Sequence, residues 1–316
     1  MNKIKKYIKT LFPNYLDSRI FNWYLDMQNM ILSSPLCLRF SKINYKKPQQ
    51  VGITDTVYVE NVRVIVSLTS FPERIKYVHR TLYSILQQKS KPNMVILWLA
   101  DSQFPNRIND IPEELVDLEK YGLSIRWTED IRSYKKLIPM LKLEEFKDDI
   151  IVTADDDIYY PEYWLESLIE SYKKNHHAIH CGLITKTEYT NNKIIFQSVL
   201  GKKGDGSCSY KYKVLGCGGI LYPPHCFYKD VICQEKFLKL APTNDDVWFW
   251  LMAVKNGYTL CWILNNMKEL HEIAGVSKNS PALYKINNLG ENRRLKETVN
   301  VLNEYDLWWI YGNEEG

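Results

Sequence analysis

The chain has 316 residues, a formal net charge of +4 at neutral pH and 45% hydrophobic residues. A charge this small for the length lacks the broad basic footprint of a nucleic-acid-binding protein, so we expect no nucleic-acid partner. The length allows one large α/β domain with appended segments.

The sequence contains no apolar run that approaches the ~20 residues needed to cross a bilayer. Its basic N-terminus lacks the continuous apolar core of a signal peptide. We therefore expect a cytoplasmic protein. The seven cysteines include no C-x-x-C pair, and four of them lack the spacing of a zinc module: Cys208, Cys217, Cys226 and Cys233. We expect free thiols in a reducing compartment.

Residues 1–50 differ in composition from the rest of the chain. A lysine-rich start leads to "SRIFNWYLDMQNMIL", in which Ile20, Tyr24 and Ile31 fall near one helical face. This pattern predicts a basic amphipathic helical extension. Such a helix either packs on the main domain or rests on an anionic membrane surface. The stretch "NYKKPQQ" at 44–50 is then interpreted as a linker.

From residue 62 the pattern alternates between strands and helices. The runs "VRVIVSLTS" and "MVILWLA" are apolar enough for strands buried on both faces, and a helical stripe at 78–86 lies between them. "LSIRWTE" and "IIVTADDD" continue the series. The pattern predicts an α/β fold with a mostly parallel central sheet flanked by helices, whose ligands bind at the carboxyl ends of the strands.

The second half of the chain continues this mixture. "YPEYWLESLIESYKKN" predicts a helix that starts near Pro161, followed by strands in "AIHCGLI" and "KIIFQSV" and a loop in "GKKGDGSCSYKY". "GCGGILYPP" predicts a tight turn into a short strand, and "PTNDDVWFWLMAVKNGY" an apolar helix capped by Asn244 or Asp245 and ended by Gly257. We expect a catalytic domain at 51–276 and a C-terminal helical segment at 277–316 that packs on it.

Three consecutive aspartates, Asp155 to Asp157, follow the predicted strand "IIVT". Adjacent carboxylates repel one another, so a cation or hydrogen-bond donors should offset their cost. In an extended stretch Asp155 and Asp157 would point the same way and could share Mg²⁺ or Mn²⁺. The alternative is that the aspartates cap the following turn and helix.

The segment after the first strand limits the enzyme classes that fit. A haloacid-dehalogenase-type phosphatase would have Thr or Val at position 159, which is Tyr. A nucleotidyltransferase would have a glycine-rich phosphate loop, and "SLTSFPERI" contains no glycine. The dinucleotide fingerprint G-x-G-x-x-G is also absent there. We expect a phosphate here to be held by metal and side chains.

Six motifs follow one another along about residues 62–275: "VSLTSFPERI", "RSYKKLIP", "ADDDIYYP", "GCGGILYPP", "NDDVWF" and "ELHEI". In this order they resemble the nucleotide-sugar-dependent glycosyltransferases of GT-A fold, of the family-2-like kind that builds bacterial surface polysaccharides. It implies a GT-A-like, Rossmann-like sheet and an inverting transfer from a nucleotide-diphosphate sugar, with UDP favoured. The implied acceptor is a glycan or lipid-linked glycan of capsule or lipopolysaccharide.

The resemblance also implies roles for single residues. Asp157 would hold the Mn²⁺ or Mg²⁺, with Asp155 and His271 as further ligands. The donor would be contacted by Asp155, Asp156, Lys135, Lys136, Arg74 and Thr69. Asp246 would be the catalytic base and Asp245 would hold acceptor hydroxyls.

Each role has a plainer alternative. The two aspartates at 245–246 could cap a helix, the lysines could lie on a solvated face, and Arg74 could form a surface ion pair. Two other functions also stay open: a metal-dependent phosphohydrolase and a non-catalytic sugar-binding protein. They stay open because a fold does not determine an activity. The resemblance favours an enzyme at the inner face of the cytoplasmic membrane, where the N-terminal segment would bind.

Overall fold

The computed structural model describes residues 43–59, 62–199, 202–264, 270–274, 276 and 293–312. The helical part of the predicted N-terminal extension lies outside these residues. The predicted boundary at 276–277 falls where the described residues stop, because 277–292 lie outside them, and the domain limits remain predictions. In the described residues no helix is both long and apolar enough to span a membrane.

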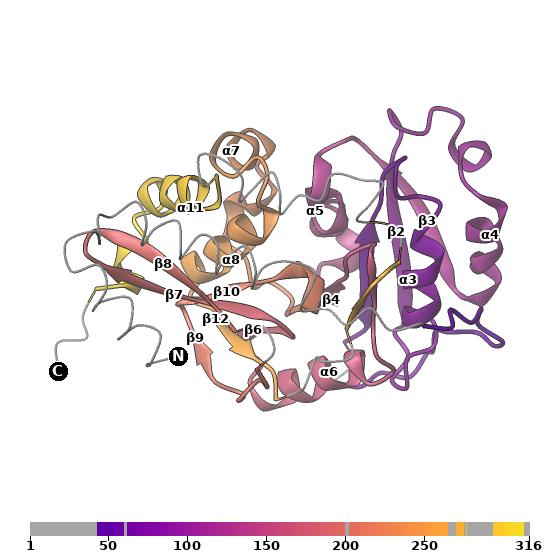
Figure 1. The fold of residues 1–316 in the computed structure, drawn as a ribbon, viewed down its shortest axis with the longest axis horizontal. Coiled ribbons are helices and arrows are strands. Elements are labelled where there is room, and N and C mark those ends of the chain that lie inside the picture. Colours follow the sequence, from indigo (N-terminus) through magenta and orange to yellow (C-terminus); the bar gives the residue numbers. More distant parts are fainter. Residues whose placement is uncertain are drawn as a thin grey trace, which may run out of the picture. The chain divides into compact units, whose positions relative to one another are not determined.

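A large sheet of eight strands forms the centre of the fold, in the order β3-β2-β1-β4-β11-β6-β12-β9 (Figure 1). The first four strands run parallel to one another, and β6 is parallel to β12, whereas β11 and β9 are antiparallel to their neighbours. The predicted mostly parallel α/β sheet is therefore confirmed. Its strands are β1 (Val64–Thr69), β2 (Met94–Ala100), β3 (Leu123–Thr128), β4 (Ile150–Thr153), β6 (Ala178–Cys181), β9 (Cys208–Ser209), β11 (Ile220–Tyr222) and β12 (Thr259–Trp262).

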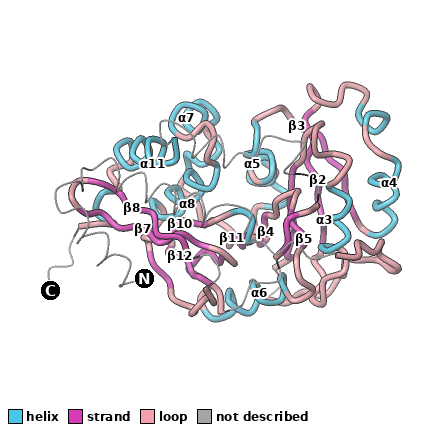
Figure 2. The backbone as a smooth tube through the Cα atoms, in the orientation of Figure 1, coloured by secondary structure: helices cyan, strands magenta, loops and turns pink. Residues whose placement is uncertain are grey.

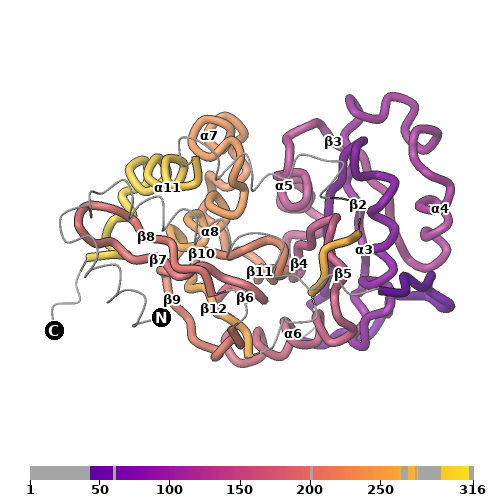
Figure 3. Tube along the Cα trace, in the orientation of Figure 1, coloured from indigo at the N-terminus to yellow at the C-terminus, as the bar shows by residue number. Residues whose placement is uncertain are grey.

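Two smaller sheets complete the strands. One has the order β10-β7-β8, and the other pairs β13 with β5. Figure 3 shows β13, which comes late in the chain, lying beside β5 directly after the aspartate triplet. Their strands are β5 (Ile158–Tyr159), β7 (Ile184–Thr190), β8 (Lys193–Ser198), β10 (Tyr212–Val214) and β13 (His271–Glu272).

Helices cover both faces of the central sheet, as the continuous apolar strands predict (Figure 2). Successive residues of β1 point to opposite faces, so Val64 and Val66 pack with α3 and α6 while Ile65 packs with α5 and α8. The helices are α3 (Val78–Ile85), α4 (Glu113–Val116), α5 (Ile138–Lys142), α6 (Trp164–Lys174), α7 (Gln234–Leu240), α8 (Asp245–Lys255) and α11 (Arg293–Glu304). The most deeply buried of them is α8, whose residues 247–254 are all buried.

The strand register brings two loops together. Ser67 of β1 lies opposite Thr153 of β4 in a parallel pair, so the chain leaves both strands at the same edge of the sheet. The loop after β1 and the aspartate triplet after β4 therefore meet there. This edge is where a parallel sheet is expected to bind its ligands.

Two local predictions need correction. Helix α6 begins at Trp164 and not near Pro161, because the Pro161 carbonyl oxygen accepts a hydrogen bond from the Trp164 amide in a preceding turn, 3.0 Å. The predicted loop at 201–212 contains β9, which pairs antiparallel with β12 and sets Cys208 opposite Cys261. These two cysteines form a disulfide, so the expectation of free thiols is wrong for them.

Candidate active site

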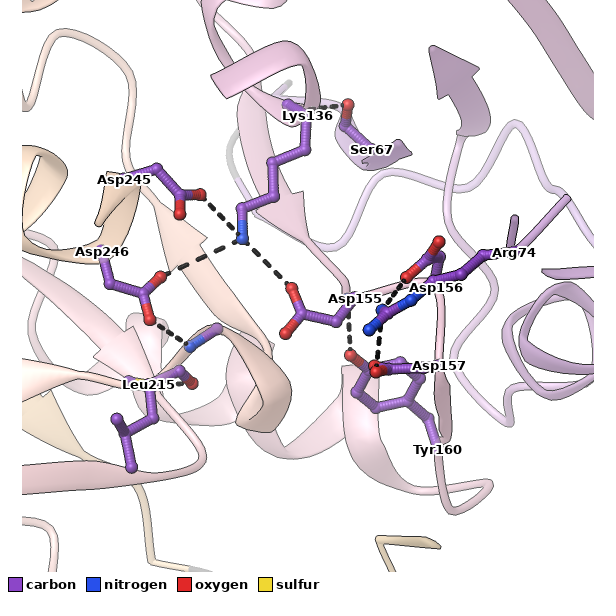
Figure 4. A network of polar contacts seen from close by, with 12 residues as sticks. Ser67, Arg74, Lys136, Asp155, Asp156, Asp157, Tyr160, Leu215, Asp245 and Asp246 are labelled. Atoms are coloured by element: carbon purple, nitrogen blue, oxygen red, sulfur yellow. Dashed lines mark hydrogen bonds and ion pairs between the residues drawn. The ribbon is translucent and has the colours of Figure 1, made fainter. Parts of the chain in front are cut away.

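The aspartate triplet divides between two cations (Figure 4). Asp155 lies 3.1 Å from the Lys136 Nζ, whereas Asp156 and Asp157 each lie 2.8 Å from the Arg74 guanidinium. The chain turns at residues 156–157, so the alternation of an extended strand does not apply. We expected Asp155 and Asp157 to share one cation, but in the structure they contact different ones.

Asp156 is the anchored member of the triplet. Besides Arg74, the Ser70 hydroxyl donates to its carboxylate at 2.6 Å, and the Thr81 hydroxyl donates to its carbonyl oxygen at 3.0 Å. Arg74 is buried and its pKa is raised by Asp156 and Asp157, although burial alone would lower it. The alternative of a surface ion pair for Arg74 is thus wrong. Ser70 is a site residue that the sequence reasoning missed.

Lys136 joins the triplet to the aspartates of α8. Its Nζ lies 3.1 Å from Asp155, 3.0 Å from Asp245 and 4.0 Å from Asp246. Burial opposes the charge on Lys136, yet the three carboxylates raise its pKa well above the ordinary value. The Lys136 backbone is tied to β1, because the Ser67 hydroxyl donates to its carbonyl oxygen at 2.6 Å.

The neighbouring lysine does not reach these aspartates. The Lys135 Nζ pairs with Asp130 at 2.8 Å. Both lysines are buried, with 2% of Lys135 and 5% of Lys136 exposed, so the alternative of a solvated face is wrong. The structure thus brings one lysine of the pair to the site and directs the other away from it.

Asp245 and Asp246 occupy the first turn of α8, but no side-chain cap is found at this helix terminus. Asp246 instead accepts a hydrogen bond from the Gly216 amide at 3.0 Å, and the Lys213 Nζ lies 3.9 Å from the same oxygen. The other oxygen of Asp246 is buried and accepts no hydrogen bond in the described structure. Burial raises the pKa of Asp246, an effect that Lys213 and Lys136 oppose.

Gly216 keeps the space between the two acidic groups open. A Cβ at this position would lie 3.0 Å from the Lys136 Nζ and 3.1 Å from both Asp155 and Asp246. A side chain here would therefore fill the point where the three groups converge. The glycine run of "GCGG" signalled a turn in the sequence, and the structure adds that Gly216 borders the site.

The remaining predicted residues lie at its edge. The Thr69 hydroxyl donates to the Trp98 carbonyl oxygen at 2.8 Å. His271 lies in β13 opposite Tyr159 of β5. The next residue, Glu272, is close enough for its charge to raise the pKa of Asp157. Glu272 was missed, although it stands in the "ELHEI" segment from which His271 was chosen.

The comparison with known families fits this arrangement. Residues 66–227 match the family described as Glycosyl transferase family 2. The chain belongs to this family. No curated protein matches it. This family-2 glycosyltransferase has the predicted GT-A-like fold.

Two solved structures are similar to it. The first is TarS residues 1–349 from S. aureus, with 12% identity, a TM-score of 0.45, and coverage of 80% of this chain and 76% of that one. The second is the inositol-1-phosphate CTP transferase from T. maritima, with 13% identity, a TM-score of 0.40, and coverage of 78% and 98%.

The charges at this candidate site fit a divalent cation. The three cations Arg74, Lys136 and Lys213 face six carboxylates: Asp155, Asp156, Asp157, Asp245, Asp246 and Glu272. Burial, together with the neighbouring carboxylates, raises the pKa of Asp157 to about 7 despite Arg74. A surplus of buried and half-buried carboxylates of this kind is the donor chemistry of a Mg²⁺ or Mn²⁺ site.

The protein would supply few of the metal ligands. Across the described residues, no three His, Cys, Asp or Glu side chains are arranged to hold a metal together. Mg²⁺ commonly binds one or two carboxylates and takes its other ligands from phosphates and water. The residues present therefore fit a cation that binds together with a phosphate-bearing substrate.

The raised pKa of Asp157 predicts how stability depends on pH. In the unfolded chain an aspartate ionises near ~3.9, so between about pH 4 and about pH 7 the folded metal-free protein holds a proton that the unfolded chain has lost. Its free energy of unfolding should fall as pH rises through this window. In Asp157→Asn this fall should be smaller, because Asp246, whose pKa burial also raises, still contributes to it. Chemical denaturation in EDTA at several pH values measures the difference. A difference between the two proteins that stays constant with pH would contradict the raised pKa.

Proposed function

We propose that this protein is an inverting, metal-dependent glycosyltransferase. It would move a sugar from a nucleotide-diphosphate donor, with UDP favoured, to a glycan or lipid-linked glycan acceptor in the synthesis of capsule or lipopolysaccharide. The observation that carries the proposal is the position of Lys136. Its Nζ contacts Asp155 after β4 and Asp245 at α8, and so joins the two acidic groups across the space that Gly216 leaves open.

Asp246 has the properties of the catalytic base. One of its oxygens is fixed by the Gly216 amide, and the other is buried without a hydrogen-bond donor in the described structure. An acceptor hydroxyl that enters this space would donate to the second oxygen. Since burial raises the pKa of Asp246, its carboxylate is a stronger base than a solvated one. Direct attack by the deprotonated oxygen inverts the anomeric configuration.

We assign binding of the nucleotide-sugar donor to the aspartate triplet. Asp157 would hold Mn²⁺ or Mg²⁺, with either Asp155 or His271 as a second protein ligand, and the metal would stabilise the negative charge of the leaving nucleoside diphosphate. Asp156, fixed by Ser70 and Arg74, would hold the loop in place and border the donor. Arg74, Thr69 and Lys136 remain the proposed donor contacts, and Lys135 is left with a packing role beside Asp130.

The place of action follows from the proposed acceptor. A lipid-linked glycan would be presented at the inner face of the cytoplasmic membrane. The basic residues 1–50 are the segment proposed to bind there.

Metal removal tests the reaction class. We expect EDTA to abolish sugar transfer and Mn²⁺ or Mg²⁺ to restore it. A thermal-shift panel of nucleoside diphosphates with Mn²⁺ should show selective stabilisation by one base, because a ligand that binds only the folded state raises its stability. Asp157→Ala should lose this stabilisation.

The matched control is Asp148→Ala, which removes an exposed aspartate paired only with His225 among the described contacts. It should respond to nucleotide and metal like the wild type. Full transfer in EDTA, with nucleotide binding intact in Asp157→Ala, would refute the metal assignment. Release of phosphate without any acceptor would favour a phosphohydrolase instead.

A further inference from the structure

Arg294 is a half-buried cation that no acidic side chain neutralises in the described part of the chain. It lies in the first turn of α11, where its Cζ is 4.3 Å from the centroid of the Phe196 ring of β8. Its Nε is buried without a hydrogen-bond partner. Burial lowers its pKa to about 10, and no carboxylate counteracts this effect. A guanidinium taken out of water is normally paired, so an anion is the expected missing partner.

A second cation lies on the same face of the small sheet. Lys213 of β10 is opposite Thr185 of β7, and Phe196 of β8 is opposite Thr187. Because Thr185 and Thr187 are two residues apart in one strand, Lys213 and Phe196 point to the same face. Lys213 is buried, and burial lowers its pKa; the charge of Asp246 opposes this effect, and the charge of Arg294 adds to it. The two cations therefore repel each other.

Lys213 borders Asp246, the proposed catalytic base. The Lys213 Nζ lies 3.9 Å from the Asp246 carboxylate, and among the described residues it donates a hydrogen bond only to the neighbouring Val214 carbonyl oxygen, 3.1 Å away. The Asp246 carboxylate also lies 4.0 Å from the Lys136 Nζ. Lys213 thus shares its one carboxylate neighbour within 4 Å with Lys136, whereas no carboxylate offsets the burial of Arg294 among the described residues.

We propose that Lys213 and Arg294 bind an anionic group, a phosphate or a carboxylate, that the acceptor carries near the hydroxyl attacked by Asp246. This assignment rests on the proposed role of Asp246 as the base. The acceptor is favoured over the donor because Lys213 contacts Asp246, whereas the triplet on the donor side has Arg74 and Lys136 as its cations. A guanidinium and an ammonium together match the oxygens of a phosphate or carboxylate.

Inorganic phosphate is the probe for the site. We expect it to raise the melting temperature of the wild type and to bind in calorimetry, and we expect Arg294→Gln to bind it about 10–100-fold more weakly, the loss of one charged hydrogen bond. Arg293→Gln, which changes the exposed arginine next to it, should bind within about 2-fold of the wild type. No stabilisation of the wild type, or equal binding by wild type and Arg294→Gln, would overturn the proposal. No nucleotide is needed, so this result does not depend on whether the proposed donor binds.

Stability without phosphate separates a binding role from a structural one. Removing an unpaired buried charge should leave the melting temperature of Arg294→Gln equal to or above that of Arg293→Gln. A clearly lower value would mean that Arg294 stabilises the fold and would count against the site. Arg294→Lys keeps the charge and should retain a phosphate response larger than that of Arg294→Gln.

A pair of nucleotide sugars identifies which substrate carries the anion. We expect the ratio of the affinities for UDP-glucuronic acid and UDP-glucose to be the same in the wild type and in Arg294→Gln. A preference for the acidic sugar that disappears in Arg294→Gln would place the anion on the donor and overturn the acceptor assignment.

Discussion

Replacing Asp246 with asparagine is expected to lower sugar transfer by ~10²–10⁴-fold, the usual cost of losing a general base. Asparagine keeps the shape of the side chain, and its amide oxygen can still accept the hydrogen bond that the Gly216 amide now donates to Asp246. Folding and donor binding should therefore persist. Transfer rates at saturating donor, with melting temperatures as the folding control, measure the effect.

The neighbouring residue provides the matched comparison. Asp245→Asn should act more mildly and mainly on acceptor affinity, because Asp245 is held by Lys136 and would only orient hydroxyls. If Asp246→Asn transfers sugar at the wild-type rate while Asp245→Asn is inactive, the base is Asp245. If both variants are active, the pair has no catalytic role. A product with retained anomeric configuration would exclude direct displacement, whichever aspartate is essential.

Replacing Lys136 with methionine should lower the free energy of unfolding by about 3–5 kcal/mol, because it leaves the buried Asp245 and the half-buried Asp155 and Asp246 without their shared cation. Methionine keeps most of the apolar length of the side chain, so the lost charge is the main change. Chemical denaturation measures the effect. The destabilisation should shrink at low pH, where the carboxylates can take up protons, and it should also shrink when Asp245→Asn is added.

Lys135→Met is the control for this variant. Lys135 is equally buried, but Asp130, its single ion-pair partner in the described part of the chain, is one-third exposed, so its loss should cost only about 1 kcal/mol. Equal destabilisation by the two substitutions would contradict the special position of Lys136. Sugar transfer should fall sharply in Lys136→Met and much less in Lys135→Met.

Local patterns in the sequence were sufficient for the fold class. The runs at 64–69, 94–100 and 150–153 are apolar on both faces, and only a sheet covered on both sides by helices buries such strands. The same reasoning placed the triplet at the carboxyl end of a strand, because acidic residues directly after an apolar run must lie where that strand ends. The sequence was therefore enough to predict residues 155–157, 245 and 246 as candidates for the site.

The division of work among these residues depended on the tertiary structure. Lys135 and Lys136 are chemically identical neighbours, and only the turn of η4 (Arg132–Lys136) directs one to Asp130 and the other to three aspartates. The turn at 156–157 likewise separates Asp155 from Asp157, a break that strand alternation could not foresee.

Contacts between segments far apart in the sequence could not be predicted from local sequence patterns. Pairing of β9 with β12 joins Cys208 to Cys261 across 53 positions, and pairing of β13 with β5 brings Glu272 toward Asp157. The sequence by itself determined which strands are buried and where the acidic residues follow them, because burial and strand ends are local properties of the chain. Only the folded chain decided which cation each carboxylate meets, because those partners lie in segments that the register of the sheets brings together.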